Sequence, residues 1–138
     1  MDEYDFSGEW IGYYTLYYEN NISKDYAFKI NMQLQDGVLK GTCVDDESII
    51  VFDEPATIDG FIEDNFISFI KKYPYAWAMD ENGKPLKFKD VASYEIHYAG
   101  NFENGIFSGY WELSIEEANE NGEISNIDSQ GTWQMRKV

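Results

Sequence analysis

Apolar and polar residues alternate through most of this chain, and this alternation constrains the fold more than any other feature of the sequence. From residue 26 to residue 34, the even-numbered positions hold Tyr, Phe, Ile, Met and Leu, whereas the odd-numbered positions hold Ala, Lys, Asn and Gln. A two-residue period of this kind predicts a β-strand with one buried face and one solvated face. The pair Asp36-Gly37 follows directly, and an Asp-Gly pair between alternating runs is a strong signal for a β-hairpin.

The same pattern recurs along the rest of the chain, with short polar turns between the runs. Strands are therefore predicted over residues 10–18, 26–34, 38–44, 56–63, 66–73, 93–102, 106–115 and 130–137, with a short further segment at 49–52. Strands joined in this way by tight turns are typical of an antiparallel meander. Two stretches interrupt it. Residues 74–92 are expected to form a lid or a small hairpin extension, and residues 116–128 to hold a helical turn.

The length of this meander favours closure. An open sheet of this size would leave two edge strands with unpaired backbone groups, and closing it into a barrel removes both edges. Glycines inside strands allow the sharp bending that a small barrel needs; here they are Gly12, Gly41, Gly60, Gly100, Gly109 and Gly131. The sequence thus predicts an all-β fold, a single antiparallel up-and-down β-barrel of about eight strands, in one domain covering residues 1–138. The interior of such a barrel is either filled by side chains or able to hold one small ligand.

Composition excludes several classes of function. The chain carries 26 acidic against 10 basic residues and has a formal net charge of −16 at pH 7. Binding to the phosphate backbone of nucleic acid requires Lys and Arg, and anionic membrane surfaces attract basic segments, so neither partner is expected. Cys43 is the one cysteine and cannot form an internal disulfide, and the first residues lack the features of a signal peptide. Both observations predict a reducing, cytoplasmic location.

The opening stretch contains the triplet Gly8-Glu9-Trp10, and the last predicted strand contains Arg136. With a meander barrel between them, these residues resemble the Gly-x-Trp motif and the terminal-strand arginine of the calycin superfamily, which comprises lipocalins, fatty-acid-binding proteins and avidins. In that superfamily the first-strand tryptophan seals one end of the barrel, and the arginine commonly packs across its ring. The resemblance therefore implies that Gly8 and Trp10 close the barrel and that Arg136 packs on Trp10 in a cation–π contact.

The sequence departs from each branch of that superfamily. Residues 20–23 leave no room for the two helices that fatty-acid-binding proteins insert between their first strands, and Lys137 and Val138 stand where those proteins complete an Arg-x-Tyr carboxylate clamp. The Thr-Asp-Tyr element of lipocalins is absent. Avidins hold biotin with an Asn and a Ser shortly after the first-strand tryptophan, but here residues 11–15 read Ile-Gly-Tyr-Tyr-Thr. Biotin binding is thus not implied, although the short loops are more similar to those of avidins.

Three Gly-x-Trp triplets place Trp10, Trp111 and Trp133 on predicted strands. These tryptophans either fill the interior as structural side chains or line a pocket for a flat or hydrophobic ligand. Inward-facing tyrosines are the better pocket candidates, because a buried hydroxyl needs a hydrogen-bonding partner. The predicted ligand-binding residues are Tyr14, Tyr26, Phe28, Tyr94, Tyr98, Trp111 and Trp133, and those predicted to close the barrel are Gly8, Trp10 and Arg136.

No catalytic residue, cofactor or metal site is predicted. His97 is the one histidine, and the strand pattern places it on the outer face beside Glu95, where it could neither hold a haem nor act in a cleft. The acidic run Asp45-Asp46-Glu47 lacks the complete loop of a calcium site, so a solvated turn is the favoured interpretation. Cys43 is expected to be a small buried side chain. Nucleophile elbows, phosphate loops and zinc patterns are absent.

The outer face of the first predicted strand carries Ile11, Tyr13 and Tyr17, which is more apolar than a solvated wall requires. Exposed apolar surface tends to mark an interface, and pairing two such walls would give a homodimer. For function, the sequence favours a barrel that binds a small hydrophobic or aromatic molecule in its interior, without catalysis. The alternative is a filled barrel that acts as a protein-interaction module through its outer wall or its acidic loops.

Overall fold

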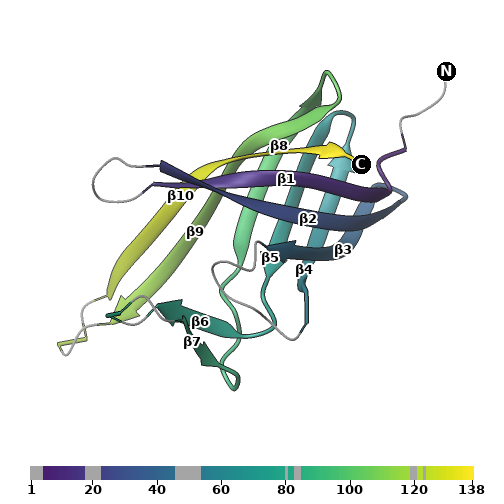
Figure 1. Ribbon diagram of the computed structural model, residues 1–138. Coiled ribbons are helices and arrows are strands. Elements are labelled where there is room, and N and C mark those ends of the chain that lie inside the picture. The colour runs from purple at the N-terminus through teal and green to yellow at the C-terminus, as the bar shows by residue number, and fades with distance from the viewer. Residues whose placement is uncertain are drawn as a thin grey trace.

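The computed structural model describes residues 5–17, 23–45, 54–79, 81–82, 85–118, 121–122 and 124–138. The strands of this described part are β1 (Gly8–Tyr17), β2 (Ser23–Gln35), β3 (Val38–Asp45), β4 (Ala56–Glu63), β5 (Phe66–Lys72), β6 (Ala76–Met79), β7 (Pro85–Phe88), β8 (Ile96–Glu103), β9 (Ile106–Ala118) and β10 (Ile124–Lys137). Eight of them form a closed barrel in the order β1-β10-β9-β8-β5-β4-β3-β2, and β6 pairs with β7 in a separate two-stranded sheet. The predicted all-β antiparallel barrel is therefore confirmed (Figure 1).

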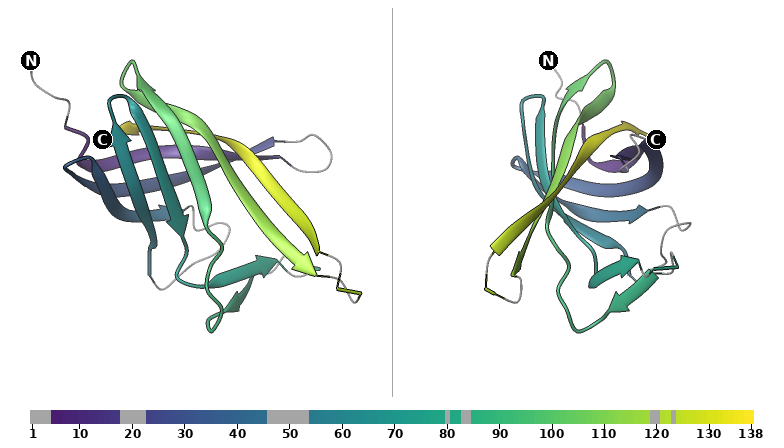
Figure 2. Two further views of the ribbon diagram at one scale, coloured as in Figure 1. Left: turned by 180° about the vertical axis from the view of Figure 1, so that it is seen from behind. Right: turned by 90° about the vertical axis from the view of Figure 1, so that its left-hand side faces the viewer.

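The barrel closes through β1, which pairs with β2 on one side and with β10 on the other. Trp10 lies opposite Ile30 of β2 and opposite Lys137 of β10, so the first and last strands of the chain are neighbours. Each barrel strand in the described part of the chain thus has two antiparallel partners, which satisfies the backbone groups that an open edge would expose. Figure 2 shows the twisted barrel with β6 and β7 beyond one end of it, away from both chain termini.

The tight turns have the geometry that their residues favour. Between β2 and β3, Asp36 and Gly37 have φ angles of 53° and 82°, as a two-residue type I′ turn requires. Between β8 and β9, Asn104 and Gly105 repeat this geometry at 55° and 83°. Glycine and short polar residues tolerate the left-handed region best, so these turns fix the register of their hairpins as the sequence predicted.

Large apolar side chains fill most of the barrel interior. Alternation is clear on β3, where Leu39 and Cys43 are buried while Val38 and Lys40 are exposed. Neighbouring strands approach closely where they bend: a Cβ atom added at Gly60 would lie 1.9 Å from the carbonyl oxygen of Ser68. Only glycine fits at such a contact, in agreement with the predicted bending role of the strand glycines.

The stretch expected to hold a helical turn is instead part of the longest hairpin. β9 continues to Ala118 and β10 begins at Ile124, and the two strands pair along their whole length. Tertiary pairing therefore overrides the weak helical preference of this acidic stretch. The expected hairpin extension is present as β6 and β7, and the segment predicted at 49–52 lies outside the described residues. No helix in the described part of the chain is long and apolar enough to cross a membrane.

Candidate ligand-binding site

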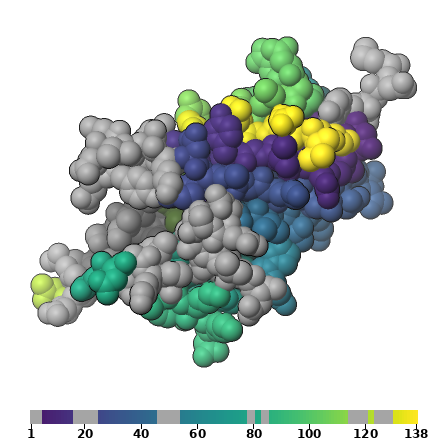
Figure 3. All heavy atoms as spheres, viewed as in Figure 1, coloured from purple at the N-terminus to yellow at the C-terminus, as the bar shows by residue number. Residues whose placement is uncertain are grey.

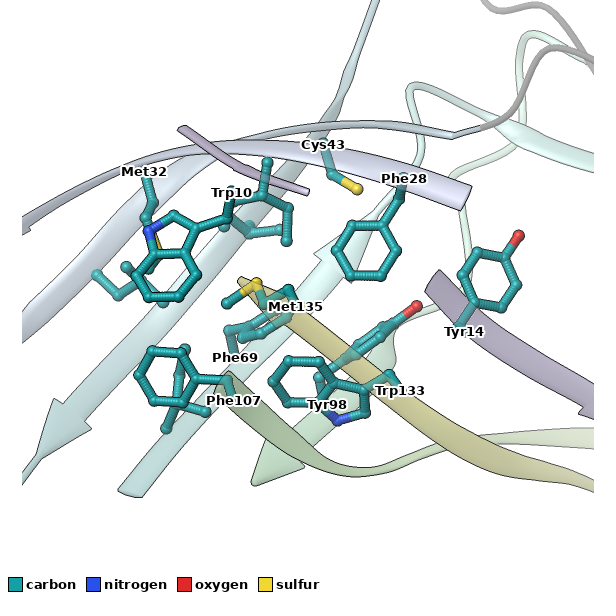
Figure 4. Packing of buried hydrophobic residues seen from close by; sticks show 14 of the residues in the cluster. Trp10, Tyr14, Phe28, Met32, Cys43, Phe69, Tyr98, Phe107, Trp133 and Met135 are labelled. Atoms are coloured by element: carbon teal, nitrogen blue, oxygen red, sulfur yellow. The ribbon is translucent and has the colours of Figure 1, made fainter. Parts of the chain in front are cut away.

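One end of the barrel interior is filled by aromatic rings. Trp10 is fully buried, and its indole Nε1 donates a hydrogen bond of 2.9 Å to the carbonyl oxygen of Phe6. The ring of Phe107 lies 5.2 Å from the Trp10 ring, and Phe102 meets it edge-on at 6.2 Å. In Figure 4, Trp10 and Phe107 lie at one end of the buried cluster, and Tyr14 lies at the other. At this end, which is called the closed end below, aromatic rings pack around Trp10.

The prediction that Arg136 packs across Trp10 is wrong. Arg136 is exposed and pairs with Ile11, because its neighbour Met135 is buried and successive side chains of a strand point to opposite faces. The residue opposite Trp10 is Lys137, whose ammonium donates a hydrogen bond of 2.6 Å to the carbonyl oxygen of Asp5. Lys137, rather than Arg136, is therefore the cation of the closed end.

A buried ion pair lies toward the other end of the interior. Lys71 is 1% exposed, and its Nζ atom lies 2.5 Å from Oδ1 of Asp45, whose side chain is 8% exposed. The hydroxyl of Tyr73 donates a hydrogen bond to the other carboxylate oxygen of Asp45. The thiol of Cys43 lies 3.6 Å from Oδ1 of Asp45. The Asp45 carboxylate thus accepts from an ammonium and a phenol, which compensates the cost of burying it.

Strand alternation explains why charged side chains point inward here. Ile67 and Phe69 of β5 are buried, and Lys71 is the next position on the same face. Cys43 of β3 is buried in the same way, and Asp45 is the next inward position. The favoured interpretation of Asp45 as part of a solvated turn was therefore wrong, because the β3 strand continues through it.

Three tyrosine rings surround the Lys71 ammonium. Its Nζ atom lies 5.2 Å from the ring centroid of Tyr14, 4.9 Å from that of Tyr73 and 5.9 Å from that of Tyr98. Cation–π contacts at these distances strengthen when the cation is removed from water. Burial acts to lower the pKa of Lys71, while the surrounding groups, Cys43 among them, raise it well above its ordinary value. Lys71 therefore stays charged at neutral pH.

The tyrosine hydroxyls and the cysteine thiol of this cluster stay neutral at the same pH. Burial is the main cause that raises the pKa of Tyr14, Tyr73 and Tyr98 above the ordinary value for a phenol. Burial likewise raises the pKa of the Cys43 thiol to about 12. The cluster therefore holds one positive and one negative charge that face each other, together with protonated hydroxyls.

A cavity of about 240 Å³ lies against this cluster. Its lining residues are mostly aromatic: Tyr14, Tyr73, Ala76, Trp77, Ser93, Tyr94, Ile96, Tyr98, Trp111 and Leu113. The barrel supplies the tyrosines 14 and 98 and Trp111, whereas β6 supplies Trp77 and the loop before β8 supplies Tyr94. The hairpin of β6 and β7 thus completes a site at the open end of the barrel.

The cavity walls are held by hydrogen bonds and ring packing. The indole of Trp111 donates a bond of 3.1 Å to the carbonyl oxygen of Thr15, which fixes its ring at the wall. The backbone amide of Tyr73 donates to the Ser93 hydroxyl at 3.1 Å, and the Trp77 ring meets the Tyr73 ring edge-on. These contacts join β6 to the segments that follow β5 and precede β8.

Four of the seven predicted ligand-binding residues line the cavity. Tyr14, Tyr98 and Trp111 are buried at its wall, and Tyr94 is 49% exposed at its edge. The remaining predictions, Tyr26, Phe28 and Trp133, do not line it. The rings of Tyr26 and Phe28 pack against the Tyr14 ring. Trp133 packs against Phe69 and Tyr98 (Figure 4). Gly8 lies at the closed end, where a Cβ atom would lie 3.2 Å from the side chain of Lys137.

Sequence reasoning missed Lys71, Asp45 and Tyr73. The alternation of β5 and β3 contained a signal for the first two, whereas Tyr73 lies just after β5 and owes its position to the chain path. His97 is exposed on the outer face, as the strand pattern predicted. Among the described residues, no group of three or more His, Cys, Asp or Glu side chains is arranged to hold a metal ion.

Comparison with known proteins identifies the fold. No family model and no curated protein sequence matches this chain. Among solved structures the chain is similar to rhizavidin, with a TM-score of 0.52 and 14% sequence identity, covering 97% of this chain and 91% of that chain. An identity this low shows the fold alone. The protein therefore has an eight-stranded antiparallel barrel fold similar to that of rhizavidin, in agreement with the predicted calycin-like barrel.

Proposed function

We propose that this protein binds a small aromatic molecule in the cavity at the open end of its barrel. The observation that carries the proposal is a cavity of about 240 Å³ with mostly aromatic walls, three of whose tyrosines surround the ammonium of a buried ion pair. An apolar cavity of about 150 Å³ is already large enough to bind benzene. The larger volume here suits a ligand of one or two rings.

Affinity and orientation would come from different parts of the site. Covering apolar surface of the ligand with aromatic walls is favourable by about 25 cal/mol per Å². The hydroxyl-bearing residues of the lining, which include Tyr14, Tyr94 and Tyr98, would supply the few polar groups that fix the orientation of a ligand in an otherwise apolar pocket. The ligand would be held and released unchanged, because the site offers aromatic surface and hydroxyls rather than an activated nucleophile.

Native mass spectrometry of the freshly purified protein tests the proposal together with a fluorescence titration. We expect a co-purified small molecule, or saturable quenching of tryptophan emission by added 2-naphthol. The substitution Trp77→Ala removes a cavity wall outside the barrel and should weaken binding roughly tenfold. Tyr110→Ala is the matched control, because Tyr110 is 75% exposed. Absence of both a bound molecule and saturable quenching would contradict the proposed function.

A second proposal concerns self-association through the outer wall. An open groove runs over β1, β2 and β10, the wall that lies on the face seen in Figure 3, and it includes Ile11 and Tyr13. Tyr13 is 38% exposed and Ile106, at the same groove, 37%. Apolar surface of this kind favours a homodimer. Light scattering at tens of micromolar should give a dimeric mass that Tyr13→Ser lowers, and a monomeric mass for the native chain would contradict the proposal.

A further inference from the structure

A separate groove of about 570 Å³ lies on the outer wall of the barrel. It runs over β1, β10, β9 and β8, which are neighbours in the barrel (Figure 1), and β2 contributes Asp25 to it. Its described lining residues are all different from those that line the cavity at the open end. Its volume lies within the range of small-molecule sites, roughly 300–1,000 Å³. A molecule bound here would therefore occupy a site distinct from the proposed aromatic-binding cavity.

Strand register sets the outward side chains of this groove in two adjacent rows. The residues of the first row, each paired with the next across neighbouring strands, are Tyr13, Gln134, Ser108 and Asn101. The second row lies two residues away on the same face and contains Thr132 and Tyr110, which pair with each other. The wall therefore presents amide and hydroxyl groups side by side, with a tyrosine ring in each row.

Tyr110 exposes its ring from within a strand. It is 75% exposed although it belongs to β9, which continues on both sides of it. A ring left in water contributes little to the fold, but it supplies binding free energy when a ligand covers it. Tyr13 is 38% exposed and provides a second ring. Two strand spacings and two residues separate these tyrosines, which places their Cα atoms about 12 Å apart along the wall.

Polar groups of both hydrogen-bonding directions lie between and beside the two rings. Asn101 and Ser108 are exposed, and Gln134 is half-buried. Amide and hydroxyl side chains both donate and accept hydrogen bonds, whereas a carboxylate only accepts. The Thr15 hydroxyl donates a bond of 2.9 Å to Oδ1 of Asp25, which holds that carboxylate at the groove. The groove thus offers donors and acceptors together with aromatic surface.

A sugar ring matches this combination of groups. A pyranose has a face of C–H groups, which packs on an aromatic ring, and a rim of hydroxyls that both donate and accept hydrogen bonds. A purely apolar ligand would instead cover the amides without pairing them, which is unfavourable. The formal net charge of −16 opposes the approach of an anionic ligand. The chemistry of the groove therefore favours an uncharged saccharide.

We infer that this outer groove binds an uncharged oligosaccharide. Its sugar rings pack on Tyr110 and Tyr13, and the distance between these tyrosines suits at least two rings. Its hydroxyls form hydrogen bonds with the side chains of Asn101, Ser108 and Gln134. This binding does not depend on the proposed function, because the two sites lie on opposite sides of the barrel wall.

Titration of the ¹⁵N-labelled full-length chain with four trisaccharides at pH 7, followed by NMR, tests the inference. The probes are cellotriose, maltotriose, mannotriose and chitotriose at millimolar concentration. We expect at least one of them to give saturable shifts in the amide signals of β1, β8, β9 and β10 around Tyr110. If none of the four gives saturable shifts, or if the shifts are confined to other strands, the inference is overturned, while the proposed function of the interior cavity is unaffected.

Substitutions at Tyr110 and Asn101 then connect the binding to the groove, since neither residue lines the groove of the proposed homodimer. Tyr110→Ala should weaken binding of the saccharide roughly tenfold, whereas Tyr110→Phe keeps the ring and should retain most of it. Asn101→Ala should weaken binding severalfold. Tyr94→Ala is the matched control, because it removes another half-exposed tyrosine ring outside the groove.

The same variants separate the two sites. Tyr110→Ala should leave binding of 2-naphthol unchanged, whereas Trp77→Ala should weaken 2-naphthol and leave the saccharide unchanged. Saccharide binding that is unchanged in Tyr110→Ala would overturn the inference. If Tyr110→Ala does not fold, Asn101→Ala decides in its place, and unchanged binding in that variant would overturn the inference equally.

Discussion

The two ends of the barrel interior are built from different chemistry. At the closed end, Trp10 packs with Phe6, Phe102 and Phe107, and its one polar atom is satisfied by a backbone carbonyl. At the open end, three tyrosines, a lysine and an aspartate share the interior with a cavity of about 240 Å³. One end is filled and apolar, whereas the other is partly empty and polar.

This difference assigns folding stability to the closed end and the proposed ligand binding to the open end. Filling an interior with large aromatic side chains contributes to folding stability in proportion to the apolar area removed from water. A buried ion pair contributes little on balance, because replacing such a pair with apolar residues is often neutral or even stabilising. The polar end is therefore assigned to the proposed ligand binding rather than to the stability of the fold. The predictions below test this separation.

Removing a ring from each end should give the largest contrast. Trp10→Ala leaves a void among packed rings and should lower the free energy of unfolding by about 4 kcal/mol. Trp111→Ala should cost less, about 2 to 3 kcal/mol, because this ring faces the cavity on one side and loses fewer contacts. Urea denaturation measures both values, and binding of 2-naphthol should weaken only in the Trp111→Ala variant. Equal losses of stability, or weaker binding in Trp10→Ala, would break the comparison.

Breaking the ion pair should cost more than deleting it. Asp45→Asn leaves the Lys71 ammonium buried without a carboxylate and should destabilise the fold by about 3 kcal/mol. The double variant Asp45→Asn/Lys71→Met removes both charges and should recover most of that loss. Urea denaturation measures the free energy of unfolding of each variant, and the double-mutant cycle gives the coupling free energy between Asp45 and Lys71. If the double variant is as unstable as the single variant, the ion pair is required for folding.

Alkaline pH should weaken the open end specifically. The pKa values of the Cys43 thiol and of Tyr14, Tyr73 and Tyr98 are raised by burial, and that of Lys71 is raised by its neighbours. The folded state therefore holds protons that the unfolded state releases above its ordinary pKa values, which begin at about 8.5 for Cys. Stability is fully present below that pH and falls as the pH rises toward 12.

Thermal unfolding followed from pH 7 to pH 11 measures this dependence. Cys43→Ala should flatten the early part of the decline, because the unfolded thiol is the first of these groups to lose its proton. Tyr94→Phe is a suitable control, since Tyr94 is half exposed. A melting temperature that stays constant or rises over this range would contradict the assignment of protons to the folded cluster.

The smallest effect is expected just outside the barrel wall. Lys72 follows Lys71 on β5 but points outward, where it lies 3.1 Å from Glu95. Solvent-exposed pairs of this kind contribute less than about 1 kcal/mol, so Lys72→Met should leave the urea midpoint nearly unchanged. A loss comparable with that of Asp45→Asn would show that exposure does not separate the two pairs.

Part of the site could be predicted from the sequence. Tyr14 and Tyr98 were predicted from alternation and Trp111 from a Gly-x-Trp triplet, and they line the cavity because inward positions of a closed barrel must face its interior. The same rule applied to β5 would have placed Lys71 inside after Ile67 and Phe69. Lys71 was missed because charged residues are generally expected to face water.

The error at Arg136 has a different origin. It came from a family resemblance rather than from the strand phase of this chain. Met135 and Trp133 are buried, so Arg136 must face outward and Lys137 inward. A shift of one residue moves a side chain to the other face of a sheet. Resemblance between motifs therefore fixes a residue's role only when the alternation of the strand agrees with it.

The sequence by itself determined the eight barrel strands apart from the distal ends of β9 and β10, the tight turns between them and the closure into a barrel. These properties are local, since they depend on a two-residue period and on residues that accept left-handed turn angles. Only the tertiary structure decided that Asp45 of β3 meets Lys71, which lies 26 residues further along the chain. It also decided that β6 closes a cavity above them. The partners that meet across the interior depend on register, twist and packing summed over several strands, which no single stretch of sequence encodes.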